Sequence, residues 1–162
     1  MKNLLAILLF LQTASQTSTE NDETYFAPTI YVFIPVCNKA HWLPFTLACL
    51  EKINYPKKRI TVQFYSDNNL DHSNSLISQW QQKNQKFYHH IGTNMNFTKP
   101  AKRMTWENPE RHRHVLSVRQ YGLERARQSW ADFFILLDAD ILLTDTEVFW
   151  SLILKGFYNK KT

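Results

Sequence analysis

An apolar run that ends in two carboxylates is the part of the sequence best suited to chemistry. Phe133 to Leu137 are five apolar residues in a row, which predicts a short strand buried on both faces. Asp138 and Asp140 follow, with the small Ala139 between them. Because side chains alternate along a strand, both carboxylates are expected on one side, where they suit Mn²⁺ or Mg²⁺ completed by a substrate diphosphate. The alternative is that they only cap the following loop or helix.

Two further polar residues are expected at the same edge of the sheet. Asn38 follows an apolar, β-branched stretch at residues 29–36, and Asp67 follows an alternating stretch at 60–65. Ligands of parallel α/β sheets bind beyond the carboxyl ends of the strands, so Asn38, Asp67 and Asp138 are candidate nucleotide-binding residues. A carboxylate at Asp67 can accept hydrogen bonds from a ribose or a base, although an Asx turn in its Ser-Asp-Asn-Asn loop would explain it equally well.

One charged residue conflicts with the apolar face of the helix predicted at residues 112–129. At about 100° per residue, Arg119 falls near the middle of the apolar arc, which is made by Val115, Val118, Gly122, Leu123, Ala126 and Trp130. A guanidinium that faces the sheet needs an anionic partner, so Arg119 is expected to organise the acidic site or contact a diphosphate, unless it snorkels to solvent. His112 and His114 have no partners at metal-ligand spacing and are expected to be exposed.

The order of the expected elements defines the fold class. Strands are expected at residues 29–36, 60–65, 86–91 and 132–137, and helices at 43–53, from about 73, at 112–129 and at 145–155. A polar loop of about twenty residues follows the third strand. Alternating strands and helices with nearly continuous apolar strands predict an α/β fold, with a mostly parallel sheet and helices on both faces.

Composition limits the classes of function. With 162 residues, 44% of them apolar, the chain is expected to form one domain. Its three glycines, Gly92, Gly122 and Gly156, lie far apart, which excludes a Walker-type phosphate loop and a G-x-G-x-x-G turn. The net charge is +5, and basic residues gather between Lys99 and Arg127. No nucleic-acid motif accompanies them, so no nucleic-acid partner is expected.

The first residues predict the compartment. Lys2 precedes an apolar run at residues 4–11, which is far shorter than the ~20 residues of a membrane span. Residues 1–16 are therefore predicted to be a cleaved signal peptide, 17–27 a flexible leader and 28–162 the domain, without a transmembrane segment.

Two features depend on this secretory route. Asn96 begins the sequon Asn-Phe-Thr and is a predicted glycosylation site. Cys37 and Cys49 could form a disulfide there, but Cys37 ends a strand and Cys49 lies about two turns into a helix. Both cysteines are therefore expected to be unpaired.

With these residues in view, the chain resembles the amino-terminal half of the procollagen galactosyltransferases and their cerebral endothelial cell adhesion relatives, grouped in glycosyltransferase family 25. The resemblance runs from about residue 28 to residue 140. It is carried by the segments 38–44 (NKAHWLP), 50–57 (LEKINYPK), 66–69 (SDNN), 113–120 (RHVLSVRQ), 126–132 (ARQSWAD) and 136–140 (LLDAD).

The resemblance implies a GT-A fold, a Rossmann-like fold of nucleotide-diphospho-sugar transferases, with a UDP-galactose donor and Mn²⁺. It further implies transfer to hydroxylysine of a collagen-like acceptor in the endoplasmic reticulum lumen. Asp67 is implied for the uridine or ribose, and Asp138 and Asp140 for nucleotide and metal. Ile141 departs from the Asn that is common in the family at this position.

No residue is a good candidate for the base that activates an acceptor hydroxyl, so no catalytic residue is assigned. We therefore expect a donor-binding part of such an enzyme, with little activity alone. A secreted adhesion or binding module that keeps the fold without catalysis is the alternative.

Overall fold

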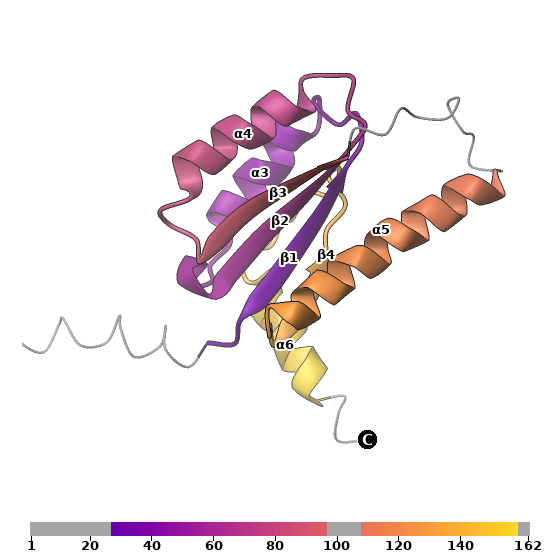
Figure 1. Cartoon of the computed structure of the whole chain (residues 1–162). Coiled ribbons are helices and arrows are strands. Elements are labelled where there is room, and N and C mark those ends of the chain that lie inside the picture. The colour runs from indigo at the N-terminus through magenta and orange to yellow at the C-terminus, as the bar shows by residue number, and fades with distance from the viewer. Residues whose placement is uncertain (1–26, 97–107, 159–162) are drawn as a thin grey trace, which may run out of the picture.

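The computed structural model describes residues 27–96 and 108–158, and these form one α/β unit (Figure 1). The sheet of the described residues has the strand order β3-β2-β1-β4, and each neighbouring pair is parallel. Its strands are β1 (Ile30–Val36), β2 (Ile60–Asp67), β3 (His90–Asn96) and β4 (Phe133–Leu136). The parallel sheet predicted from the sequence is confirmed.

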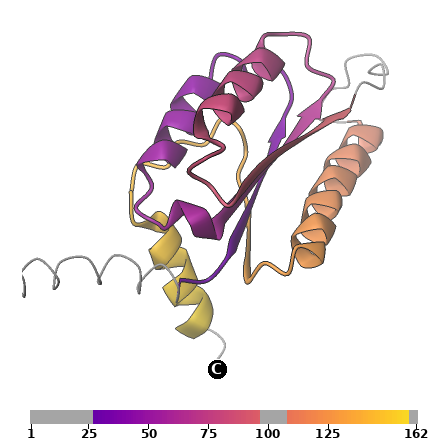
Figure 2. The same cartoon turned by 60° about the vertical axis from the view of Figure 1, so that its left-hand side comes forward.

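Helices cover both faces of this sheet, as predicted (Figure 2). The helices are α3 (Leu43–Lys52), α4 (Ser73–Asn84), α5 (Pro109–Gln128) and α6 (Val148–Tyr158), with the short 3₁₀ helix η1 (Lys57–Arg59) before β2. Residues of α3, α4 and α6 join one core with one side of the sheet, whereas residues of α5 pack on the other side. Figure 2 also shows the first turns of α5 at the same end of the molecule as the strand arrowheads.

The central strand β1 is buried on both faces because each of its alternating sides meets a helix layer. Val32 and Ile34 belong to the larger core beneath α3 and α4. Tyr31 and Phe33 point to the other side and pack with Val118 of α5. This two-sided burial explains why the β1 sequence reads as continuously apolar.

Helix α5 rests on the sheet through a narrow set of small residues. Its buried residues are Val118, Gly122 and Ala126. A Cβ atom on Gly122 would lie 2.5 Å from Cδ1 of Phe33, so the helix approaches β1 as closely as a residue without a side chain allows. This close approach brings the start of α5 to the carboxyl ends of the strands.

The third strand lies later in the chain than predicted, at His90–Asn96 in place of residues 86–91. The apolar pair Phe87 and Tyr88 favoured a strand there, but the Tyr88 hydroxyl donates to the carbonyl of Leu50 and its ring is buried beside Trp80. The true strand is largely polar because, among the described strands, β3 pairs with β2 alone and lies at an edge of the sheet.

The other observed boundaries differ from the predicted ones by a few residues, which is normal for helix ends.

Cys37 and Cys49 are both free, as predicted. Within residues 27–96 and 108–158, no helix is long and apolar enough to cross a membrane. The predicted signal peptide and nearly all of the leader lie outside the described residues.

Candidate functional site

Polar residues from all four strands meet at the carboxyl edge of the sheet. Asp67 is the last residue of β2 and stands in register with Asn96, the last residue of β3. Asn38 follows β1 by two residues, and Asp138 follows β4 by two residues. The predicted site residues therefore share one edge, where ligands of parallel sheets bind.

The acidic pair lies in a turn and not in the strand. β4 ends at Leu136, and the Ile141 N–H donates to the Asp138 carbonyl at 3.0 Å, which closes a turn over residues 138–141. Strand alternation therefore does not set the directions of the two carboxylates, and their placement on one side stays a prediction without that premise. Asp138 contacts Arg119 of α5, and Asp140 contacts Lys39 of the loop after β1.

Asp140 is held in an ion pair. The Lys39 ammonium donates to Oδ2 of Asp140 at 2.5 Å, and this bond, with the charge of Lys39, holds the pKa of the Asp140 carboxyl below its ordinary value against the opposing effect of burial. The Thr46 hydroxyl of α3 donates to the buried carbonyl of Ala139 at 2.9 Å and fixes the backbone between the carboxylates. The Asp140 side chain is 36% exposed and ionised, so it remains accessible to a ligand.

Arg119 does not face the sheet, which corrects the sequence prediction. The buried residues of α5 are Val118, Gly122 and Ala126, so Arg119 lies at the edge of that face and its side chain is 47% exposed. Its guanidinium Nη2 still lies 3.9 Å from Oδ2 of Asp138. The expected partner is therefore present, although in a loose and half-exposed ion pair.

Both carboxylate oxygens of Asp67 have partners within the site. Its Oδ1 accepts from Nδ2 of Asn68 at 2.9 Å and from Nδ2 of Asn96 at 3.2 Å. Its Oδ2 lies 2.6 Å from Nε2 of His114. With its side chain only 17% exposed and partners on both oxygens, Asp67 is held in one orientation at the end of β2.

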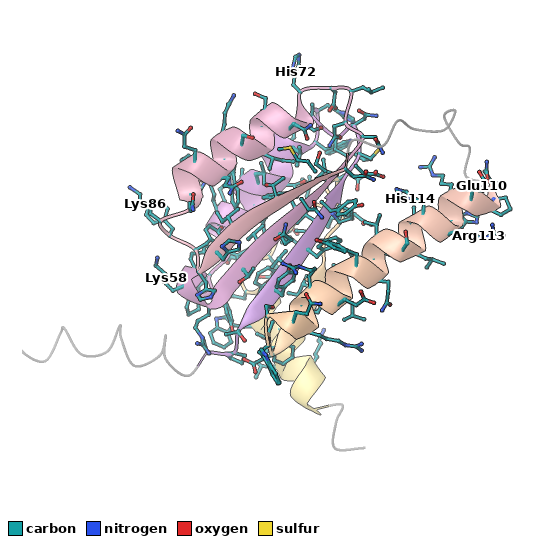
Figure 3. All side chains as sticks on the ribbon, in the orientation of Figure 1. Lys58, His72, Lys86, Glu110, Arg113 and His114 are labelled. Carbon is teal, nitrogen blue, oxygen red and sulfur yellow. The ribbon has the colours of Figure 1, made fainter. Side chains whose placement is uncertain are left out.

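His114 is the site residue that sequence reasoning missed, because it was interpreted as an exposed residue of the helix start. Figure 3 labels it near the amino-terminal end of α5. It precedes the buried Val118 by one helical turn, so it shares the side of α5 that faces the sheet. That spacing could have indicated a role for His114, but its partner Asp67 lies 47 positions away in the sequence.

Asn38 holds the loop after β1 against the loop after β2. Its backbone has φ 51°, its N–H donates to Oδ1 of Asn69 at 2.5 Å, and its Oδ1 accepts from the Leu70 N–H at 2.7 Å. The neighbouring Ala40 N–H donates to Asp71 at 2.9 Å. Asn38 therefore supports the shape of the site, and its contact with a nucleotide stays a prediction.

The predicted glycosylation site Asn96 lies beside Asp67. Its Nδ2 donates to Asp67, and a glycan would be attached to that same nitrogen. A glycan on Asn96 would therefore lie beside Asp67, the residue predicted to contact the nucleotide. Asn96 glycosylation stays a prediction.

The chemistry of Asp138 and Asp140 fits part of the coordination shell of Mn²⁺ or Mg²⁺. Carboxylate oxygens are the ligands these cations prefer, and diphosphate or water oxygens ordinarily complete the shell. Within the described part of the chain, no group of three or more His, Cys, Asp or Glu residues could hold a metal ion.

The sequence matches a family model described as "Glycosyltransferase family 25, N-terminal domain" over residues 27–158. Procollagen galactosyltransferase 1 of Danio rerio is 34% identical over 137 residues, which cover 82% of this chain and 22% of the relative. A glycosyltransferase 25 family member of Anopheles gambiae is 33% identical over 156 residues, covering 93% and 26%. The chain spans about a quarter of the length of these relatives.

Two solved structures share the fold at low sequence identity. The mannosyltransferase PcManGT of Pyrobaculum calidifontis, in complex with GDP-Man and Mn²⁺, has a TM-score of 0.55 and 16% identity, covering 75% of this chain and 30% of that one. S. aureus TarS in complex with UDP-GlcNAc has a TM-score of 0.56 and 17% identity, covering 78% and 30%. The predicted GT-A fold is confirmed.

Proposed function

This chain belongs to glycosyltransferase family 25, and from that premise we propose that it binds a UDP-sugar together with a divalent metal ion. The proposed donor is UDP-galactose and the proposed acceptor is hydroxylysine of collagen; the names of its relatives support the galactosyl group and procollagen. The matched region is the amino-terminal domain of the family, so we expect the chain alone to bind the donor and transfer little sugar. The proposed compartment is the endoplasmic reticulum lumen.

The observation that supports this proposal is the set of three carboxylates at the carboxyl edge of a GT-A sheet. Asp67 ends β2, whereas Asp138 and Asp140 lie in the turn after β4, and each of the three has a partner from another element. Asp138 and Asp140 do not form buried structural ion pairs, because the side chains in these pairs are about one third to one half exposed. Partly exposed carboxylates at this edge are suited to ligand binding.

Each of these residues has a proposed role. Asp67, oriented by His114 and Asn96, accepts hydrogen bonds from the uridine ring or the ribose. Asp138 and Asp140 provide metal ligands. A bound Mn²⁺ would offset the negative charge that develops on the departing UDP.

Charge placement explains why both carboxylates have basic neighbours. A diphosphate brings at least two negative charges next to two carboxylates, and like charges at such distances repel. Arg119 and Lys39 lie beside Asp138 and Asp140 and supply the compensating positive charge. Arg119 is in addition suited to contact a phosphate oxygen through its planar guanidinium.

Calorimetric titration of the full chain with UDP tests the proposal. We expect UDP binding that requires Mn²⁺ and that falls by about tenfold or more in Asp138→Asn and Asp140→Asn, since each substitution removes a charged metal ligand. Glu124→Gln is the matched control, because it removes one negative charge from an exposed position of α5. Comparing UDP-galactose with UDP-glucose then tests the donor sugar.

Two outcomes would contradict the proposal. If UDP binds with equal affinity in the absence of a metal ion, the metal ion is not part of the binding site. No binding of UDP under any condition would favour the alternative of a secreted binding module that keeps the fold without the chemistry.

A further inference from the structure

Each carboxylate of the acidic pair already has a cation beside it. Lys39 Nζ lies 2.5 Å from Asp140, and Arg119 Nη2 lies 3.9 Å from Asp138. The two negative charges are thus matched by two positive charges of the chain itself. A bare divalent cation arriving here would meet a site whose charge is already balanced, and it would stand close to an ammonium of the same sign.

Lys39 is placed so that its ammonium can leave Asp140 while its backbone stays fixed. Its N–H donates to the Ser73 hydroxyl at 3.0 Å, and its carbonyl accepts from the N–H groups of Trp42 and Leu43 at 2.9 Å. The Lys39 side chain itself is 34% exposed, and its flexible methylene stem ends in a point charge without fixed geometry. An ammonium of this kind can move from a carboxylate to a nearby phosphate.

The Arg119 pair differs from the Lys39 pair in strength. Its 3.9 Å separation and half-exposed side chains indicate a weak contact that solvent screens. Lys39 is therefore the main obstacle to a metal ion that approaches Asp140.

We propose that Lys39 is an exchangeable counter-ion of Asp140, which keeps a bare divalent cation from binding and passes to the diphosphate when metal and nucleotide bind together. This inference rests on the proposed function, since the diphosphate is its second partner. It makes Lys39 a positioning residue that couples metal binding to nucleotide binding. The metal ion and the nucleotide then bind with strong mutual dependence.

The test measures Mn²⁺ binding to the full chain without nucleotide, by the electron paramagnetic resonance signal of free Mn²⁺. We expect weak binding by the wild type and binding tighter by about tenfold or more in Lys39→Met. Lys39→Arg retains the cation and should bind Mn²⁺ as weakly as the wild type. Lys83→Met is the matched control, because Lys83 also pairs with a carboxylate, Glu51 at 3.2 Å, away from this site.

The same variants are then titrated with UDP in the presence of saturating Mn²⁺. Lys39→Met should lose about tenfold in UDP affinity, because the diphosphate loses its ammonium partner. Lys83→Met should match the wild type. Urea unfolding midpoints establish that each variant is folded, and Lys39→Gln replaces Lys39→Met if the methionine variant is not.

The outcomes separate this inference from the proposed function. If the wild type binds Mn²⁺ alone as tightly as Lys39→Met does, the counter-ion role is wrong even where UDP binding still requires metal. If the wild type binds no UDP, the proposed function fails, while the metal-only comparison still decides whether Lys39 opposes metal binding at Asp140. If Lys39→Met and Lys83→Met gain Mn²⁺ affinity equally, the gain comes from the change in net charge and the inference is overturned.

Discussion

Replacing Gly122 by alanine should destabilise the protein, although alanine favours helices more than glycine does. Gly122 lies within α5 and faces the ring of Phe33, which is fully buried in β1. An added Cβ would lie 2.5, 2.6 and 2.8 Å from Cδ1, Cγ and Cε1 of that ring. Ordinary carbon contacts begin near 3.5 Å, so either the ring or the helix must move by about 1 Å.

The magnitude follows from two opposing effects. The Phe33 ring cannot turn freely, because its neighbours Tyr65 and Tyr121 each lie 6.2 Å from it between ring centroids. Overpacking of such a core costs about 1–3 kcal/mol, and the helix preference of alanine over glycine returns about 1 kcal/mol. We therefore expect Gly122→Ala to lower the free energy of unfolding by up to about 2 kcal/mol.

Urea unfolding followed by circular dichroism measures this change, with Gly156→Ala as the control. Gly156 also lies in a helix, but its added Cβ would come no closer than 3.3 Å to Phe133, so that variant should stay close to the wild type. Since α5 carries His114 and Arg119, the Gly122 variant should also bind UDP more weakly. A Gly122→Ala protein as stable as Gly156→Ala would refute the close packing of α5 on β1.

Two further predictions concern stability. Burial lowers the pKa of Lys57 from 10.5 to about 8, so between these values the unfolded chain binds more protons than the folded one. The free energy of unfolding should therefore rise from pH 8 to about pH 10. Lys57→Met should lack that rise when its urea midpoint is measured across this range. Curves of urea midpoint against pH that run parallel for the two proteins would contradict this expectation. Trp130 has φ 54° just after α5 and is 91% exposed, so Trp130→Gly should raise the free energy of unfolding by about 1 kcal/mol. A lower urea midpoint for that variant would mean that the indole makes stabilising contacts.

Much of the fold could be predicted because its elements bury apolar side chains in regular patterns. β1, β2 and α3 were predicted to within about two residues, since each has a sequence dominated by one or two buried faces. β3 was misplaced because an edge strand has a largely polar sequence, while the apolar Tyr88 just before it packs under the helices. The local sequence pattern shows which residues are buried. At the edge of a sheet, the buried residues need not belong to the strand itself.

The candidate site divides in the same way. The sequence by itself determined that carboxylates follow buried parallel strands, and that places Asp67, Asp138 and Asp140 at one edge of the sheet. Only the tertiary structure decided their partners, because His114 meets Asp67 across 47 positions and Lys39 meets Asp140 across 101. Those contacts depend on how closely α5 approaches β1 and on how the turn at 138–141 leaves β4. Periodicity along a chain describes which way a side chain points, but the distance between two elements is set by the packing of all the side chains between them.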